Sequence, residues 1–323
     1  MCRRGLVPLL GFVALLALTQ SAQSQAWPRK PVKIVVPFAA GGNTDIIARI
    51  VAQPLSEAFG QPFVVENRPG ATGVIAAEAV ARSSPDGHTL FMATLPQIAI
   101  VPAMIKAPYD PVKDFVPISN IGTNPSVLVV RPSLPASTLA EFTDYVRRHP
   151  GKLTYVAPGV GSLNHLSMVL FLKRTDLTMT PVMYKGGPAG LNDVVAGHVD
   201  AYFANLSVVV PHAATGALRL LAVTGENRAR QIPHVPTLAE SGVPGLTSLL
   251  WTGLMAPAGT PGEIIDRIAR AVSQAISDPR VAERLAGNGV DPLGNSPAEF
   301  AATIAQDIAL WAEAIKIAGV SQE

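Results

Sequence analysis

The sequence predicts an α/β protein of two domains, each built on a largely parallel sheet. Strand-like and helix-like segments alternate almost throughout the chain, as expected for successive βαβ units. The 323 residues leave enough chain for two domains of ordinary size after removal of a leader. Hydrophobic residues make up 48% of the chain, so both domains can bury a core and disorder is not indicated.

Residues 1–26 are predicted to form a secretory signal peptide. A basic start precedes an apolar run at residues 6–18, and small residues follow it up to Ala26. The run is short for a transmembrane span, and no later stretch is apolar over the roughly 20 residues that a bilayer requires. We therefore expect cleavage near Ala26 and release of the mature chain into the periplasm.

The charge of the mature chain excludes nucleic acid as a partner. Without Arg3 and Arg4, 23 basic residues face 23 acidic residues, and no basic run is present. Cys2 is the sole cysteine and lies ahead of the apolar run. We therefore expect no lipid anchor, no disulfide and no thiolate metal site.

The first elements follow from local patterns. Residues 32–38 read as a buried strand, and apolar residues at helical spacing then predict a helix that ends at Gly60. A second strand and a turn occupy residues 63–73. A short helix is expected over about residues 74–81, and a turn and third strand over residues 84–94.

The middle of the chain begins with a proline-bracketed strand at residues 123–135, which is suited to crossing between domains. Thr138 and Glu141 match a capping box at the start of the next helix. Two strand–loop–helix units follow at residues 153–175 and 180–198, and two further strands are expected at 200–205 and 218–224.

The last third contains a strand at residues 249–261 that returns to the first domain and two long helices. Capping boxes with a following proline introduce these helices at residues 260–263 and 296–299. The predicted organisation is a first domain of residues 27–124 plus 249–323 and a second domain of residues 125–248.

Three glycine-containing turns each lead from a strand into a helix, and they contain the sequences "VVPFAAGGNTDII", "YVAPGVGSLNH" and "VMYKGGPAGLND". In a parallel sheet such turns lie at the carboxyl ends of the strands, where ligands of open α/β proteins bind. Unpaired N–H groups and the helix dipole make each helix start suited to a carboxylate or phosphate. The alternative is that these are ordinary βα turns in which glycine serves only the backbone.

The sequence gives little support for nucleotide binding, metal binding or catalysis. The segment "GVGSLN" lacks the third glycine of a dinucleotide fingerprint, the glycine pairs lack the Lys-Ser/Thr of a P-loop, and the histidines are scattered. No cofactor or metal is therefore expected. Ser162 and His165 suggest a hydrolase pair, but no nucleophile elbow surrounds the serine, and capping plus packing is the alternative.

The sequence allows two interpretations of the role of several single residues. Asp45 stabilises the dipole of its helix or pairs with a ligand ammonium. Lys185 neutralises a ligand carboxylate or lies solvated on the surface. Trp251 and Tyr184 are expected to pack in the core or at a hinge rather than stack on a ligand.

Motifs along the whole mature chain resemble the Bug family, the extracytoplasmic solute receptors of tripartite tricarboxylate transporters. The resemblance rests on several stretches in order, including "WPRKPVKIVVPFAAGGNTDIIARIVAQPLSEAFGQPFVVENRPGATG", "YKGGPAGLNDVVAGHVDAYFAN", "PHAATGALRLLAVT" and "WTGLMAPAGTP". It implies a type II periplasmic-binding-protein-like clamshell that catalyses no reaction, acts as a monomer and passes its solute to membrane permease subunits. A signalling partner in place of a permease stays open as an alternative.

The resemblance also implies a set of ligand-binding residues and a class of ligand. Ala39 stands where the family usually has proline, and the apolar segment "TLPQIAIVP" replaces a more polar version, which points to a less polar ligand. The expected ligand is a small carboxylate or amino-acid-like solute. The residues carried over are Phe38, Ala39, Ala40, Gly41, Gly42, Asp45, Thr94, Leu95, Gly159, Ser162, His165, Gly187, Pro188, Ala189 and Asn205.

Overall fold

The computed structural model describes residues 27–184, 186–213 and 215–320. The predicted signal peptide, its cleavage point near Ala26, Cys2 and Lys185 lie outside the described residues. Within the described part of the chain, no helix combines the length and the hydropathy needed to cross a bilayer.

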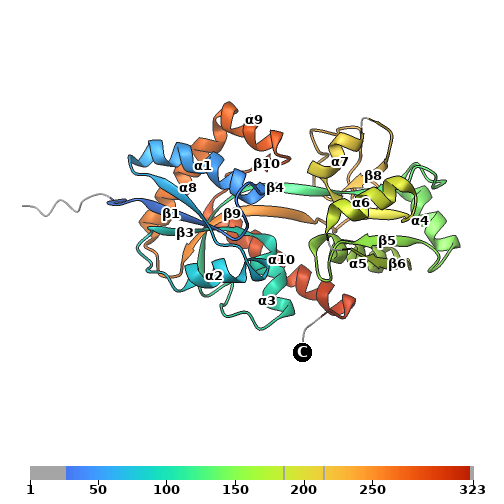
Figure 1. The fold of residues 1–323 in the computed structure, drawn as a ribbon, viewed down its shortest axis with the longest axis horizontal. Coiled ribbons are helices and arrows are strands. Elements are labelled where there is room, and N and C mark those ends of the chain that lie inside the picture. The colour runs from blue at the N-terminus through green and yellow to red at the C-terminus, as the bar shows by residue number, and fades with distance from the viewer. Residues whose placement is uncertain (1–26, 185, 214, 321–323) are drawn as a thin grey trace, which may run out of the picture.

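The elements form two lobes that a long strand, β4 (Phe115–Val130), connects (Figure 1). The first lobe contains the N-terminal elements and the last third of the chain. Its elements are β1 (Val32–Val36), α1 (Asn43–Phe59), β2 (Phe63–Asn67), η1 (Ala71–Gly73), α2 (Val74–Ala81), β3 (Thr89–Thr94), η2 (Pro96–Ile100), α3 (Val101–Met104), β9 (Leu249–Pro257), α8 (Gly262–Ser277), α9 (Pro279–Gly287), β10 (Asp291–Pro292) and α10 (Pro297–Ala318).

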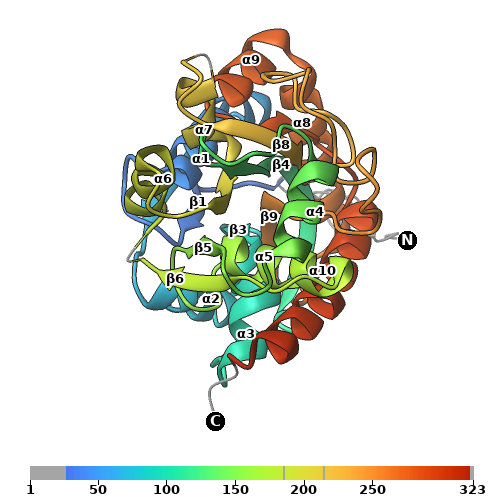
Figure 2. The ribbon, with the colours of Figure 1, turned by 90° about the vertical axis from the view of Figure 1, so that its right-hand side faces the viewer.

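The second lobe contains the middle of the chain, and Figure 2 shows this lobe toward the viewer. Its elements are α4 (Leu139–Arg148), β5 (Thr154–Ala157), α5 (Leu163–Thr175), β6 (Thr180–Met183), α6 (Gly187–Ala196), β7 (Ala201–Asn205), α7 (Leu206–Ala213) and β8 (Arg219–Val223).

The sheet has a parallel set of strands in each lobe and an antiparallel centre. Its strand order is β2-β1-β3-β9-β4-β7-β5-β6, with β10 and β8 paired to β4. β1, β2 and β3 are parallel, as are β5, β6 and β7, whereas β4 and β9 run antiparallel to their neighbours. The predicted α/β class is confirmed, and the antiparallel centre is the feature that links the two parallel sets.

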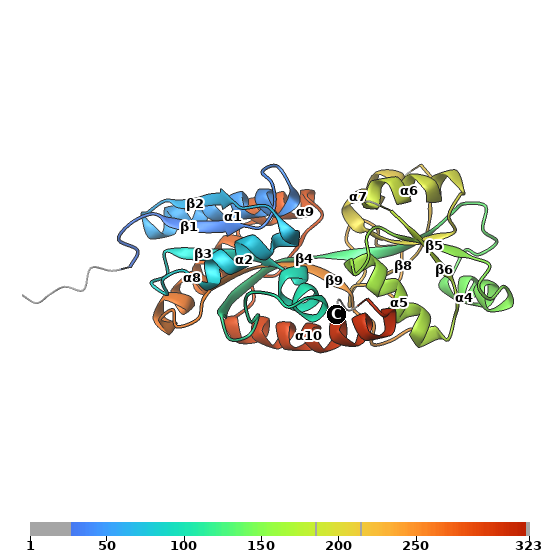
Figure 3. The same ribbon diagram turned by 60° about the horizontal axis from the view of Figure 1, so that its bottom comes forward.

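Alternation along the strands places helices on both faces of the sheet. In β5, Tyr155 and Ala157 pack in the cluster that contains α5, whereas Val156 packs with Leu191 and Val194 of α6. Figure 3 shows α5 and α6 on opposite sides of these strands, and α10 running beneath both lobes. The contacts of α10 with α5 in the second lobe make this helix a brace along one side of the molecule.

The observed helix boundaries can be compared with the capping and stop signals predicted from the sequence. α2 spans the predicted residues, and Gly60 ends α1 with a φ of 64°. Ser296 and Glu299 form the predicted capping box of α10. At α4, Thr138 caps the N–H of Glu141, but the Glu141 carboxylate accepts from Ser137 rather than returning to Thr138.

The predicted capping box at residues 260–263 is wrong. Pro261 takes the N-cap position of α8 and offers no side-chain cap, while the Thr260 hydroxyl donates to the Pro257 carbonyl. The strand expected at 123–135 is also corrected, because β4 begins at Phe115 and is one continuous strand of 16 residues. Helix α7 occupies residues for which the sequence pattern predicted only a connection between two strands.

Candidate functional site

The loops after the parallel strands of the two lobes face each other. Thr94 ends β3 and is level with Thr252 of β9, which in turn pairs with Gly122 of β4. Farther along β4, Ser126 pairs with Asn205, the last residue of β7. Because β7 runs antiparallel to β4 and parallel to β5, the carboxyl ends of both parallel sets point toward each other across the middle of β4.

The register also gives the spacing between the facing edges. Gly122 and Ser126 are four residues apart on β4, and a strand rises about 3.3 Å per residue, so the two strand ends are roughly 13 Å apart along β4. This spacing suits a small organic molecule. The strands that precede the three glycine loops singled out by the sequence therefore belong to parallel sets whose carboxyl ends face each other.

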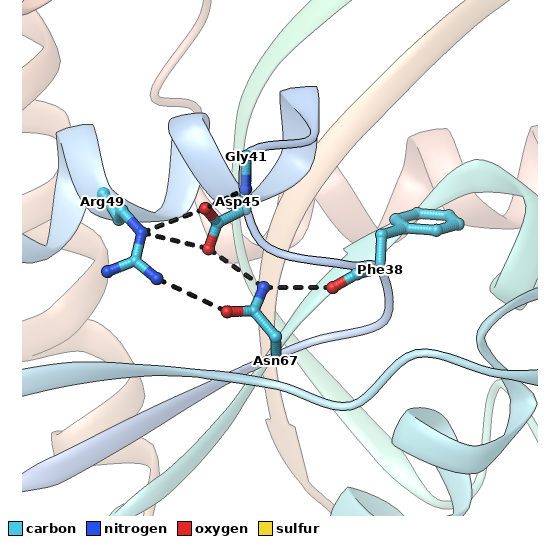
Figure 4. A network of polar contacts seen from close by, with 5 residues as sticks. All are labelled: Phe38, Gly41, Asp45, Arg49 and Asn67. Carbon is cyan, nitrogen blue, oxygen red and sulfur yellow. Dashed lines mark hydrogen bonds and ion pairs between the residues drawn. The ribbon is translucent and has the colours of Figure 1, made fainter.

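The loop between β1 and α1 is held by Asp45. The carboxylate accepts hydrogen bonds from the Gly41 N–H at 2.9 Å, from Arg49 Nε at 3.0 and 3.1 Å, and from Asn67 Nδ2 at 3.0 Å. Asn67 also donates to the Phe38 carbonyl, so the start of the loop is tied to the same group. Figure 4 shows the Phe38 ring turned away from this cluster.

These contacts define the role of Asp45. Its residue is only 2% exposed. Burial would raise the pKa of the carboxyl, but the hydrogen bonds from Arg49, Gly41 and Asn67 outweigh burial and hold the pKa below its ordinary value. The observed contacts of the Asp45 carboxylate are those of loop ordering, and they occupy the group that pairing with a ligand ammonium would require.

Two further loops of the first lobe are joined by hydrogen bonds of the Gln97 side chain, which is fully buried. Its side-chain oxygen accepts from the Thr94 N–H and hydroxyl, and its Nε2 donates to the Thr72 carbonyl at 2.8 Å. Thr94 and Leu95 are 2% and 0% exposed, so the Thr94 hydroxyl is occupied within the protein. Gln97 thus links the end of β3 to the turn that follows β2.

That turn was missed by sequence reasoning as a functional candidate. Ala71 and Thr72 adopt φ values of 46° and 54°, a left-handed conformation that side chains other than glycine rarely adopt. Such backbone strain persists where surrounding contacts enforce it and is concentrated at functional sites. The available signal was the pair Gly70 and Gly73 around these residues, directly after a predicted strand.

In the second lobe, the loop after β5 begins α5 with Ser162 as its N-cap. The Ser162 hydroxyl accepts from the His165 N–H at 3.3 Å, and His165 Nδ1 accepts from the Gly161 N–H at 3.2 Å. Burial lowers the pKa of His165, which favours the neutral ring that accepts this bond. The observed contacts of Ser162 and His165 are those of helix capping and loop ordering.

The loops after β6 and β7 adjoin this one. Asn164 Nδ2 donates to Asn205 Oδ1 at 3.0 Å and so joins the loop after β5 to that after β7. A Cβ added at Gly187 would lie 2.9 Å from the Tyr202 hydroxyl, so glycine permits the close start of α6. Pro188 and Ala189 continue this first turn and are exposed.

The helix starts at α1 and α6 have donors for a ligand. Gly42 and Gly186 occupy the two N-cap positions, and neither helix has a side-chain cap. The first N–H groups of each helix therefore point to solvent or to a ligand rather than to a capping oxygen. An anion is the natural partner of such groups, because the helix dipole adds favourable electrostatic energy.

The two lobes touch near these loops. A Cβ at Gly161 of the second lobe would lie 2.3 Å from Met104 Sδ and Cε of the first lobe. A Cβ at Gly289 would lie 2.9 Å from the Ser207 Cβ. The two lobes are therefore in close contact at these two points.

A cavity of about 770 Å³ lies beside β4 and β9, where they connect the two lobes, and its lining includes Trp251 and Asp307 but none of the glycine-loop residues. Trp251 is 1% exposed, and its Nε1 donates to Asp307 Oδ2 at 2.7 Å, which confirms the predicted packing role of this residue. Burial raises the pKa of Asp307 to about 6, although the hydrogen bond from Trp251 opposes that rise. The described residues contain no group of three or more His, Cys, Asp or Glu side chains arranged to hold a metal ion.

Comparisons with known proteins agree with this architecture. A family model described as "Tripartite tricarboxylate transporter family receptor" matches residues 47–320. The chain is 34% identical over 310 residues to Protein BugT of Bordetella pertussis, a match that covers 95% of each chain.

Solved structures show the same similarity. A Rhodopseudomonas palustris protein with adipate is 37% identical with a TM-score of 0.75, and the match covers 92% of this chain and 99% of that one. MatC from the same species, with bound malate, is 34% identical with a TM-score of 0.70 over 90% and 100% of the two chains. The periplasmic binding protein BugD is 31% identical with a TM-score of 0.71 over 92% and 100%.

Proposed function

We propose, from the premise that this chain belongs to the tripartite tricarboxylate transporter receptor family, that it is a periplasmic receptor for a small carboxylate. The solute binds between the two lobes and is passed to the permease subunits of a tripartite tricarboxylate transporter. The chain acts as a monomer and carries out no chemical step on the solute. The single observation that carries the proposal is the register of β4, which directs the glycine loops of both lobes toward one gap.

Backbone N–H groups are the proposed anchors for the carboxylate. The uncapped starts of α1 and α6 lie on opposite sides of the gap, and both carry the positive end of a helix dipole. One helix start contributes typically 0.3–1 kcal/mol near a surface, so useful affinity requires several that converge on one desolvated anion. The proposed direct contacts come from Phe38, Ala39, Gly41, Gly42, Gly159, Gly187, Pro188, Ala189 and Asn205, with Asp45, Thr94, Leu95, Ser162 and His165 supporting the loops.

The two lobes are proposed to move as domains with the predicted boundaries. β4 exchanges its partner strands between Pro125, which pairs with Leu249 of β9, and Ser126, which pairs with Asn205 of β7. This exchange lies next to the predicted boundary after residue 124. A hinge at this point lets the gap close over a ligand, as in other two-domain binding proteins.

A matched pair of glycine variants tests the site. Gly41 and Gly197 have φ values of 81° and 83°, and no atom lies within 4 Å of a Cβ built at either position. Alanine therefore imposes the same backbone strain, roughly 1–2 kcal/mol, at both positions. Gly197 ends α6, at the opposite end of that helix from the proposed site.

The assay is a thermal-shift screen of organic acids, followed by calorimetry. A ligand at 100 times its Kd adds about 2.7 kcal/mol to the free energy of unfolding, which raises the Tm of a chain of this size by roughly 4 °C. We expect Gly41→Ala to weaken binding at least tenfold and Gly197→Ala to leave it unchanged. Equal affinities in the two variants, or no response to any carboxylate, would count against the proposal.

A further inference from the structure

Exposed apolar side chains are concentrated at the facing edges. Of the eight large hydrophobic residues that are exposed in the described chain, four lie in or beside the loops that close the gap. Ile75 is 50% exposed in the first turn of α2, and Val160 is 60% exposed in the loop after β5. Met183, at the end of β6, is 49% exposed, and Val208, in the first turn of α7, is 37% exposed.

The charged side chains of the same loops are already paired where the structure describes them. Asp45 is buried against Arg49, and Arg68 after β2 forms an ion pair with Glu66. Lys185, also in these loops, lies outside the described residues. The described loops therefore present no unpaired carboxylate that would attract a ligand ammonium group.

Polar side chains of these loops are largely occupied as well. Ser162 caps α5, and Asn164 donates to Asn205 Oδ1, which leaves the Asn205 Nδ2 donor for a ligand carboxylate. A ligand hydroxyl buried here without a partner would lose its hydrogen bonds to water, and such a loss is costly. The loops are thus suited to an anion through their backbone N–H groups and to hydrocarbon through their side chains.

We propose that the site selects organic acids with an apolar body over polyhydroxylated acids and amino acids. This inference rests on the proposed function and specifies its substrate class. The backbone N–H groups hold a carboxylate, and Ile75, Val160, Met183 and Val208 cover the hydrocarbon on closure. Each methylene removed from water favours binding, because burial of apolar surface is favourable in proportion to its area.

Adipate and galactarate form the test pair. Both have six carbons and two terminal carboxylates, and galactarate differs by four hydroxyl groups. Isothermal titration calorimetry with the mature protein should show at least tenfold tighter binding of adipate. Hexanoate should likewise bind at least tenfold more tightly than 6-aminohexanoate, since no described loop carboxylate is free to pair with the ammonium.

The possible results distinguish failure of the proposed selectivity from failure of the proposed receptor function. Galactarate binding as tightly as adipate would overturn the inference and leave the proposed receptor function standing. No binding of any of the four acids, together with no response to the wider acid screen, would overturn both.

A matched pair of valine variants locates the effect. Val160→Thr conserves shape and replaces a methyl with a hydroxyl in the loop after β5. Val112→Thr makes the same change at a 64% exposed position, near Phe115 at the far end of β4. We expect Val160→Thr to reduce the ratio of adipate to galactarate affinity at least threefold, and we expect Val112→Thr to leave this ratio unchanged. The same ratio in both variants would contradict the contact proposed between Val160 and the ligand hydrocarbon.

Discussion

The half-buried Asp307 carboxyl, which is bonded to Trp251 of β9, predicts a stability that depends on pH. In the folded protein burial raises its pKa from 3.8 to about 6, with the Trp251 hydrogen bond as the opposing contribution. The folded state therefore binds this proton more tightly than the unfolded chain does. The contribution to stability is fully present below about pH 4 and is lost as pH rises through about 6.

The size of the effect follows from the difference between the two pKa values. A difference of about 2 units, at 1.36 kcal/mol per unit, corresponds to roughly 3 kcal/mol of stability lost between pH 4 and pH 7.5. Asp307→Asn removes the titration and keeps an oxygen that accepts from Trp251. The variant should therefore be more stable than the natural protein at pH 7.5 by up to about 3 kcal/mol, with the difference vanishing near pH 4.

Urea denaturation followed by tryptophan fluorescence measures this directly, because Trp251 contacts the carboxylate. Asp266→Asn, at an exposed position on α8, is the control for loss of one negative charge. Four further charged residues, Asp291, Glu226, Arg228 and Arg230, line the same cavity, so the natural protein and both variants are compared at every pH. A difference between natural protein and Asp307→Asn that stays constant from pH 4.5 to 7.5, or a destabilised variant at pH 7.5, would refute the reasoning.

Three further changes test the loops. Asp45→Asn should lower the free energy of unfolding by about 2 kcal/mol at pH 7. Because the folded pKa of Asp45 lies below its ordinary value, denaturation experiments should show the difference begin to shrink below about pH 4 and vanish as pH falls through the folded pKa. Gly161→Ala should weaken solute binding at least tenfold in calorimetry, because alanine is strained at a φ of 70° and its Cβ would displace the Met104 side chain. Met104→Ala should restore the part of the affinity that this contact costs, and an unrestored double variant would mean that backbone strain alone is responsible. Ser162→Ala should cost about 1 kcal/mol of stability through the lost N-cap, and an esterase activity that this change abolishes would contradict the capping role.

Sequence patterns predicted the parts of the fold that depend on local chemistry. The apolar spacing of α1, its glycine stop and the capping box of α10 are short-range features, and the structure confirms them. The glycine loops were identified because turns from a parallel strand into a helix lie where ligands of α/β proteins bind, although glycine in such turns also serves the backbone alone. Their position on one gap depends on the register of β4, which no local pattern specifies.

The features that sequence reasoning missed depend on tertiary contacts. β4 contains Pro117 and Pro125 within a paired strand, and register shifts after Pro117 and Asn120 accommodate the irregular pairing with β9. Gln97 gave no signal of its own, because its importance lies in partners at Thr94 and Thr72 that are distant from one another in sequence. The predicted cap at Thr260 failed because of a local contact instead, since its hydroxyl donates to the Pro257 carbonyl three residues earlier.

A crystal structure of the mature protein with adipate, or with an acid that native mass spectrometry finds bound after purification, tests the central proposal most directly. We predict a ligand carboxylate within about 2.7–3.2 Å of backbone nitrogens from the α1 start in one lobe and the α6 start in the other. An acid bound in the hinge cavity beside Asp307, or held by loops of a single lobe, would contradict the account.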